Sequence, residues 1–190
     1  MSASSMNVKK HIFLYRGALD PDDCKLIIKN SENIDYDQHI WYGSDGQTEN
    51  KIFDNPEPLV NYPEYPSHIN DIIHSLMEDY AFETGERFNI NAHVKLRVNK
   101  YGKDSIMDEH VDHIQSLFDG TSKGIPILSS IIGLNTDYEG GDIVFFHGVN
   151  QTRYRLETGD MIIFPSCFLY PHRVESITLG IRYTAVTWGF

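Results

Sequence analysis

Cysteines are few in this sequence and long apolar runs are missing, and each shortage excludes a class of protein. The 190 residues include only two cysteines, Cys24 and Cys167, with no CxxC pattern. A disulfide scaffold and a cysteine-ligated zinc site are therefore both unexpected. No stretch approaches the roughly 18–20 apolar residues that cross a bilayer. The charged N-terminal segment has no apolar run behind it, so we expect neither a membrane partner nor a signal peptide.

Positive charge is scarce as well. Lys and Arg number 16 against 27 Asp and Glu, and the formal net charge is −11. An acidic surface repels phosphate backbones and anionic lipid headgroups, so nucleic acid is not an expected partner. The sequence favours a cytoplasmic enzyme or binding protein, and it carries no indication of oligomeric state.

Aromatic residues, in contrast, are plentiful. The 11 Tyr, 10 Phe and 2 Trp favour strands, and the length suffices for one hydrophobic core. We predict a disordered N-terminus over residues 1–9 and a single domain over 10–190. Within that domain we expect helical support over about 10–90 and a β core over about 91–190.

Two helices are expected in the first half. Asp20 is a good N-cap and Pro21 suits the first helical position, so a helix begins there. A second helix is predicted over about 66–84, where apolar residues recur at helical spacing: Ile69, Ile72, Ile73, Leu76 and Met77. Residues 36–66, between the helices, show no clear period, and a loop of that length is often functional.

The second half shows the signals of strands. Segments such as "NAHVKLRVNKY", "ILSSIIGLN", "DMIIFP" and "GIRYTAVTW" are separated by "NTDYEGG", "HGVNQ" and "ETGD". Short strands joined by Gly, Asn and Asp turns are typical of an antiparallel sandwich or barrel. The expected architecture is a helical layer packed on a β-sandwich of the jelly-roll type.

The stretch "DEHVDH" contains the pair His110 and Asp112. Two residues apart on an extended segment, these side chains point to the same side. A non-haem Fe(II) site needs two imidazoles and one carboxylate, so a second histidine is required. His172 near the final strand is one candidate, and His113 and His147 are rivals. The alternative is that the pair belongs to a solvated acidic turn.

The last strand segment carries an arginine in an apolar setting. In "GIRYTAVTW", alternation places Arg182, Thr184, Val186 and Trp188 on one face. Such an arginine is costly unless it meets an anion, and its planar fork matches a carboxylate. The alternative is a guanidinium that reaches solvent from the end of the strand.

These residues resemble the prolyl 4-hydroxylase-like 2-oxoglutarate- and Fe(II)-dependent oxygenases over about residues 91–190. That family has a Tyr nine residues before the His of its His-x-Asp pair, and here it is Tyr101. Its distal His is followed ten residues later by Lys or Arg, matching His172 and Arg182, and a Trp six residues further matches Trp188. "YEGGDIVFF" and "ETGDMIIFPS" are similar to the family's Gly-Gly strand and Gly-Asp turn, and "HIFLYRGALDPDDCKLII" is a weaker match to its opening.

The resemblance implies a mainly-β fold with N-terminal helices around a double-stranded β-helix core, of the jelly-roll or cupin type. It implies iron held by His110, Asp112 and His172, with Fe(II), 2-oxoglutarate and O2 as reactants and ascorbate as an accompanying reductant. Decarboxylation of 2-oxoglutarate to succinate would drive hydroxylation of an unactivated C–H bond. The retained Asp112 favours hydroxylation, because in related halogenases a small residue there makes room for halide.

The resemblance also assigns the cosubstrate residues. Arg182 would bind the distal carboxylate of 2-oxoglutarate, helped by the Tyr101 hydroxyl. The family uses a Thr hydroxyl where this chain has Ser129, and Ser130 is the alternative if the register shifts by one. Trp188 would complete the site and help to place the substrate.

A protein or peptide substrate that contains proline is the first expectation. The alternatives are the same chemistry on a free amino acid or small metabolite, and a catalytically silent jelly-roll module that binds sugar or a partner protein. Two departures from the family concern the substrate: Met107 stands where a second Tyr is frequent, and Gly133 stands where Tyr is common.

The aromatic segment at about 38–65 is expected either to form a lid over the site or simply to cap the sheet. Its candidate lid residues are Trp41, Tyr42, Phe53 and Tyr62.

Overall fold

A large antiparallel sheet is the frame of the computed structural model, which describes residues 7–42, 48–49, 54–85, 88–112, 118–119, 123–146 and 148–190. The strand order is β1-β14-β10-β17-β6-β5-β2. The strands are β1 (Phe13–Tyr15), β2 (Asp37–Gln38), β5 (Leu59–Asn61), β6 (Arg97–Tyr101), β10 (Leu128–Gly133), β14 (Met161–Pro165) and β17 (Arg182–Gly189).

A smaller sheet of four strands faces the large one, in the order β13-β12-β15-β7. Its strands are β7 (Met107–His110), β12 (Ile143–Phe145), β13 (Thr152–Tyr154) and β15 (His172–Val174). Three strand pairs complete the β-structure: β3 (Trp41–Tyr42) with β4 (Thr48–Glu49), β8 (Phe118–Asp119) with β9 (Lys123–Gly124), and β11 (Tyr138–Gly140) with β16 (Ile177–Gly180). Two short 3-10 helices are η1 (Val8–His11) and η2 (Gly148–Asn150).

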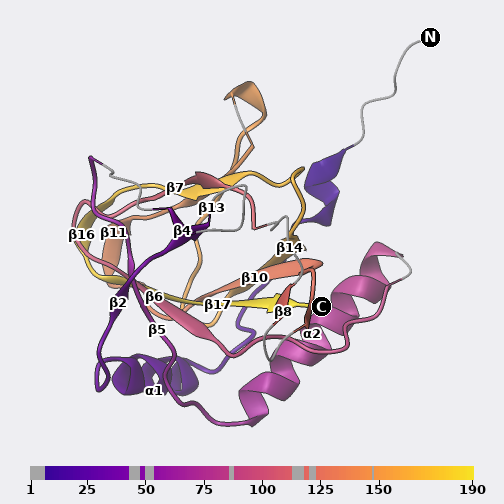
Figure 1. The fold of residues 1–190 in the computed structure, drawn as a ribbon, viewed down its shortest axis with the longest axis horizontal. Coiled ribbons are helices and arrows are strands. Elements are labelled where there is room, and N and C mark those ends of the chain that lie inside the picture. Colours follow the sequence, from indigo (N-terminus) through magenta and orange to yellow (C-terminus); the bar gives the residue numbers. More distant parts are fainter. Residues whose placement is uncertain are drawn as a thin grey trace.

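Both predicted α-helices are confirmed. Helix α1 (Pro21–Ser31) begins after Asp20, whose side chain accepts a hydrogen bond from the Asp22 N–H at 2.8 Å. Helix α2 (His68–Thr84) ends at Gly85, which takes the left-handed conformation with φ 69°. Figure 1 shows both helices on the side of the large sheet away from β7 and β13.

Side chains alternate across the large sheet, and each face has its own apolar cluster. Towards the helices point Val98, Leu128, Ile132, Met161 and Ala185, which pack with residues such as Ile27, Ile73 and Met77. Towards the smaller sheet point Ile131, Ile162, Phe164 and Val186, which pack with Phe145 and Val174. Two facing sheets with helices outside match the expected jelly-roll architecture.

Two predictions for the first half of the chain are wrong. Residues 36–66 are not one long loop, because β2 and β5 add the last two strands to the large sheet. Val60 and Asn61 of β5 are buried against β6, but three residues are too few to show a period. The disordered N-terminus does not extend to residue 9, since η1 begins at Val8; residues 1–6 lie outside the described part.

Within the described ranges, neither helix combines the length and the apolar character that crossing a bilayer requires.

The predicted Gly-Asp turn is organised by Asp160. This carboxylate is 2% exposed and accepts hydrogen bonds from the backbone N–H groups of Gly17 at 3.0 Å and Glu157 at 2.9 Å. It also accepts one from the Arg16 guanidinium. The turn that precedes β14 is thereby tied to the segment that follows β1.

We expect Asp160→Ala to lower the free energy of unfolding by about 2–4 kcal/mol, because several donors lose one shared acceptor. Urea denaturation of the purified protein measures this loss. Glu139→Ala, at an exposed position of β11, is the control. Equal stability of the two variants would show that Asp160 does not organise the turn.

Candidate metal and cosubstrate site

Strand pairing brings together the three residues expected to hold iron. His110 ends β7, Asp112 follows two residues later, and His172 begins β15 directly opposite His110. Asp112 Oδ1 lies 3.3 Å from His110 Nε2 and 3.9 Å from His172 Nε2. One ligand atom from each residue lies within 4.8 Å of the others. The rivals His113 and His147 lie outside the described residues.

Backbone carbonyls set the tautomer of both imidazoles. His110 Nδ1 lies 2.8 Å from the Asp108 carbonyl oxygen, and His172 Nδ1 lies 3.1 Å from that of Tyr170. A carbonyl only accepts, so each Nδ1 carries the proton and donates it. This leaves Nε2 of each ring, which faces Asp112, as the atom that can bind a metal once it is deprotonated.

The surroundings of His172 and Asp112 favour the protonation states that bind a cation. His172 is 3% exposed, and burial together with the nearby His110 lowers the pKa of His172 to about 4. Burial opposes ionisation of Asp112, but His172, His110 and a hydrogen bond from the Ser129 hydroxyl hold the pKa of that carboxyl far below its usual range. A neutral imidazole and an ionised carboxylate are the forms that bind Fe(II).

Aromatic rings surround the two histidines. Phe145 and Phe164 have their ring centroids 5.4 Å and 4.9 Å from that of His172, and Trp41 lies edge-on to His110 at 5.3 Å. These contacts leave each imidazole little freedom to turn. Two imidazoles and one carboxylate, held in this way, fit a non-haem Fe(II) ion.

Arg182 lies on the facing sheet, with no carboxylate partner among the described residues. Its residue is 1% exposed, and its Nε and Nη1 have no hydrogen-bond partner among the described residues. The Tyr101 ring lies 4.9 Å from its guanidinium carbon, and the Thr184 hydroxyl two residues along β17 is likewise buried without a partner. A buried unpaired charge is strongly destabilising. The distal carboxylate of 2-oxoglutarate would satisfy both the guanidinium and the hydroxyl.

A comparison with protein families decides which family this is. The model of the 2OG-Fe(II) oxygenase superfamily matches residues 96–190, which is half of the chain. The chain belongs to the 2OG-Fe(II) oxygenase superfamily. The matched region contains Tyr101, the three candidate metal ligands and Arg182.

Curated relatives of this oxygenase are PKHD-type hydroxylases. The one from Idiomarina loihiensis is 31% identical over 96 residues, covering 50% of this chain and 41% of the relative. The one from Acinetobacter baylyi is 30% identical over 126 residues, covering 64% of this chain and 53% of the relative. The match thus spans about half the length of these relatives, or less.

Solved structures show that the fold is shared. A prolyl hydroxylase from Trichoplax adhaerens, in complex with a peptide fragment of hypoxia inducible factor, gives a TM-score of 0.68 at 14% identity and covers 95% of this chain and 83% of its own. A prolyl-4-hydroxylase from Pseudomonas putida gives 0.66 at 13% identity and covers 94% and 91%. The predicted double-stranded β-helix fold of this oxygenase is thereby confirmed.

The structure places Ser129 beside the metal ligands. Its hydroxyl lies 2.7 Å from that of Ser166 and also bonds to Asp112. Ser130 has the parity of the helix-facing residues, so the register is not shifted by one. The hydroxyl on the same strand face as Arg182 is Thr184. Sequence reasoning placed Thr184 on this face without giving it a role.

Gly141, the second glycine of "YEGG", makes room for Arg182. Its φ is +72°, and a Cβ there would lie 2.8 Å from Arg182 Cδ and 2.5 Å from Ile177 Cδ1. Only glycine combines this backbone conformation with this close approach. The motif therefore positions the arginine stem.

We expect Gly141→Ala to raise the 2-oxoglutarate requirement and to lower the unfolding free energy by about 1–3 kcal/mol. The matched control is Gly148→Ala, because Gly148 has φ +55° but no atom near its Cβ position. Titration of 2-oxoglutarate against both variants separates crowding of Arg182 from backbone strain. An equal shift in both would contradict the role given to Gly141.

The two departures from the family have packing reasons. A Cβ on Gly133 would lie 2.7 Å from the Glu157 carbonyl oxygen and 2.9 Å from Leu156 Cβ, so a tyrosine has no space there. Met107 is buried opposite Val174, in the cluster between the sheets. Both positions are filled by this chain's own packing.

Sequence reasoning missed two further residues at this site. Arg97 and Asn99 alternate with apolar residues on β6, which indicates a polar face but not what covers it. The Arg97 guanidinium lies 4.9 Å from the centroid of the Trp188 ring, and its Nε donates to Asn99 Oδ1 at 3.0 Å. Asn99 is buried and lies 3.4 Å from the Tyr101 hydroxyl.

Of the four aromatics proposed for a lid, the structure places Trp41 at the site. It is buried, its Nε1 donates to Glu57 at 2.5 Å, and its ring contacts His110. Tyr62 is 53% exposed and follows β5 at the sheet edge. Phe53 and the side chain of Tyr42 lie outside the described residues. Lid closure stays a prediction.

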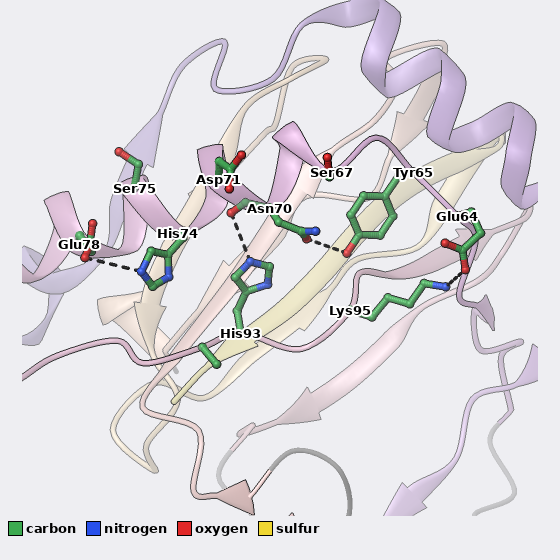
Figure 2. Close-up of a pocket in the computed structure, with 11 residues that line it drawn as sticks. Glu64, Tyr65, Ser67, Asn70, Asp71, His74, Ser75, Glu78, His93 and Lys95 are labelled. Carbon is green, nitrogen blue, oxygen red and sulfur yellow. Dashed lines mark hydrogen bonds and ion pairs between the residues drawn. The ribbon is translucent and has the colours of Figure 1, made fainter.

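A separate cavity of about 910 Å³ lies between α2 and residues 92–95 (Figure 2), and none of the three candidate metal ligands lines it. Several of its polar side chains already have partners: Tyr65 with Asn70, His74 with Glu78, Lys95 with Glu64, and His93 with the Asn70 carbonyl. None of them is a buried group without a partner in the part of the chain that is described. We assign this cavity no role.

Proposed function

We propose that this chain is an Fe(II)- and 2-oxoglutarate-dependent dioxygenase that hydroxylates an unactivated C–H bond. One observation carries the proposal. A convergent set of two imidazoles and one carboxylate faces a sheet whose buried Arg182 finds no anion in the part of the chain that the structure describes. A silent binding module has no use for both features at once.

Each residue has a defined task in this reaction. His110, Asp112 and His172 would hold the iron, and Arg182 with Thr184 would orient 2-oxoglutarate through its distal carboxylate. Together, iron and 2-oxoglutarate supply oxidation of the substrate C–H bond by O2, coupled to release of succinate and carbon dioxide.

The residues around the metal ligands limit their movement. The ring of Trp41 packs on His110, and those of Phe145 and Phe164 pack on His172, which holds the orientation of both imidazoles. Ser129 adds a hydrogen bond that lowers the pKa of Asp112, after the larger effects of His172 and His110.

A peptidyl proline is the proposed substrate. The support is that solved neighbours of the same fold are prolyl hydroxylases, and one of them was captured with a peptide fragment. The same chemistry on a free amino acid or small metabolite is the second candidate. Use of ascorbate and a cytoplasmic location belong to the same proposal.

The test is succinate formation from 2-oxoglutarate with Fe(II) and ascorbate, against a panel of proline-containing peptides, free amino acids and small metabolites. We expect succinate, together with a product heavier by one oxygen atom in mass spectrometry. Asp112→Ala is the matched inactive control. Turnover of a small metabolite alone would replace the peptide assignment. No succinate above the control with any substrate would contradict the enzyme proposal itself.

A further inference from the structure

The arginines of this protein divide into two groups by their partners. Each of the following has a carboxylate oxygen within 4.0 Å: Arg16, Arg153, Arg155 and Arg173. Among the described arginines, only Arg97 and Arg182 have none. Both lie on the same face of the large sheet, on the paired strands β6 and β17. An unpaired guanidinium is notable in a chain whose net charge is −11.

Arg97 is held in place without its charge being neutralised. Its guanidinium lies over the Trp188 ring at 4.9 Å, and its Nε is fixed by Asn99 Oδ1 at 3.0 Å. No further hydrogen bond or ion pair joins it to the described residues, so its Nη atoms are available. A planar guanidinium fixed in this way can form two parallel hydrogen bonds to a carboxylate at little entropic cost.

The position of Arg97 is beside the metal ligands. Trp188, on which it stacks, pairs across the strands with Ser129, whose hydroxyl bonds to Asp112. Arg97, Asn99 and Tyr101 alternate along one face of β6. Exposure decreases from half-buried Arg97 to buried Tyr101, next to Arg182. Arg97 and Arg182 thus lie at opposite ends of one sheet face, with Arg97 at the more exposed end and Arg182 at the buried end.

His39 adds a second unused polar group in the same region. Its Nδ1 is buried without a hydrogen-bond partner among the described residues, and its ring lies 4.9 Å from that of Trp41. Burial and the nearby Arg97 lower the pKa of His39 to about 3, so the ring is neutral at physiological pH. A neutral imidazole with a free Nδ1 can donate a hydrogen bond to an anion.

We propose, on the basis of the function proposed above, that the substrate carries a carboxylate and that Arg97 binds it. Under that function, the two carboxylates of 2-oxoglutarate would have their own partners, the distal one at Arg182 and the other at the metal held by His110, Asp112 and His172. Arg97 is then left for a different anion. The carboxylate is either the α-carboxylate of a free amino acid or an acidic side chain next to the hydroxylated residue of a peptide.

Tryptophan fluorescence tests this directly, because both tryptophans of the chain, Trp41 and Trp188, lie at the site. The protein is loaded with Fe(II) and 2-oxoglutarate under nitrogen, so that ligand binding is measured without turnover. Two matched ligand pairs are titrated. The first is L-proline against L-prolinamide, and the second is an N-acetylated Pro-Asp peptide against its Pro-Asn counterpart.

We expect wild type to bind the carboxylate member of at least one pair about tenfold or more tightly than its amide. The pair that shows this preference identifies the source of the carboxylate. In Arg97→Gln the preference falls to near one, while the affinity for the amide and the 2-oxoglutarate requirement stay unchanged. Arg97→Lys should recover part of the carboxylate preference. Arg153→Gln on β13, which removes an arginine paired with Glu175, is the control and should keep the wild-type preference.

Four results would overturn the inference. The first is that wild type shows no preference for the carboxylate ligands. The other three concern Arg97→Gln: an undiminished preference, equally weakened binding of both members of a pair, or a raised 2-oxoglutarate requirement. Equal weakening would make Arg97 a packing residue, and the raised requirement would make it part of the cosubstrate site. Because binding is measured without O2, an intact preference without succinate formation would defeat the proposed function alone.

Discussion

His172→Ala is expected to abolish iron-dependent succinate formation, with a loss greater than the hundredfold or so that follows removal of a mere supporting contact to a metal ligand. The residue supplies one of the three ligand atoms, and in the described ranges no other group of His, Cys, Asp or Glu can replace it. The smaller alanine side chain should leave the fold intact and create a cavity beside Phe145 and Phe164. Calorimetric titration measures the loss of Fe(II) binding, and a succinate assay measures the loss of turnover.

The controls for this prediction are three histidines outside the triad. His113→Ala and His147→Ala test the rivals raised by the sequence, and both should keep most of the activity. His74→Ala removes a half-exposed histidine of α2 that pairs with Glu78. If His147→Ala were the inactive variant and His172→Ala remained active, the assignment of the metal ligands would be wrong.

Arg182→Met should raise the 2-oxoglutarate requirement sharply. Deleting one partner of a buried charged hydrogen bond costs about 2–5 kcal/mol, and each 1.4 kcal/mol corresponds to about a tenfold weaker cosubstrate affinity. Methionine keeps much of the apolar stem, and it removes a buried charge for which the described ranges offer no anionic partner. Stability without cosubstrate should therefore be unchanged or higher. Denaturation in the presence and absence of 2-oxoglutarate, with a titration of turnover, separates the two effects.

Smaller effects are expected from the neighbours of Arg182. Tyr101→Phe and Thr184→Val each remove one hydroxyl, at a cost of about 1–3 kcal/mol in cosubstrate binding. Unchanged 2-oxoglutarate dependence in a folded Arg182→Met variant would show that the cosubstrate carboxylate binds elsewhere.

Local signals in the sequence determined the elements with strong patterns. Asp20 and Pro21 set the start of α1, because capping depends only on neighbouring residues. The recurrence of apolar residues set α2, and alternation in "GIRYTAVTW" put Arg182 and Trp188 on one face. The candidate metal ligands followed from the fixed intervals of a family resemblance, which carry information about distant contacts that composition does not.

The tertiary structure decided what depends on contacts between distant segments. Pairing of β15 with β7 sets His172 against His110, and no local pattern encodes that register. Contacts between distant segments also made part of the predicted loop into strand β5, which pairs with β6. They placed Ser129 beside Asp112, and they set the polar face of β6 towards the candidate site. Alternation tells which side chains share a face, but only the packing of the sheets tells what that face meets, and so the unpaired Arg97 became visible only in the folded chain.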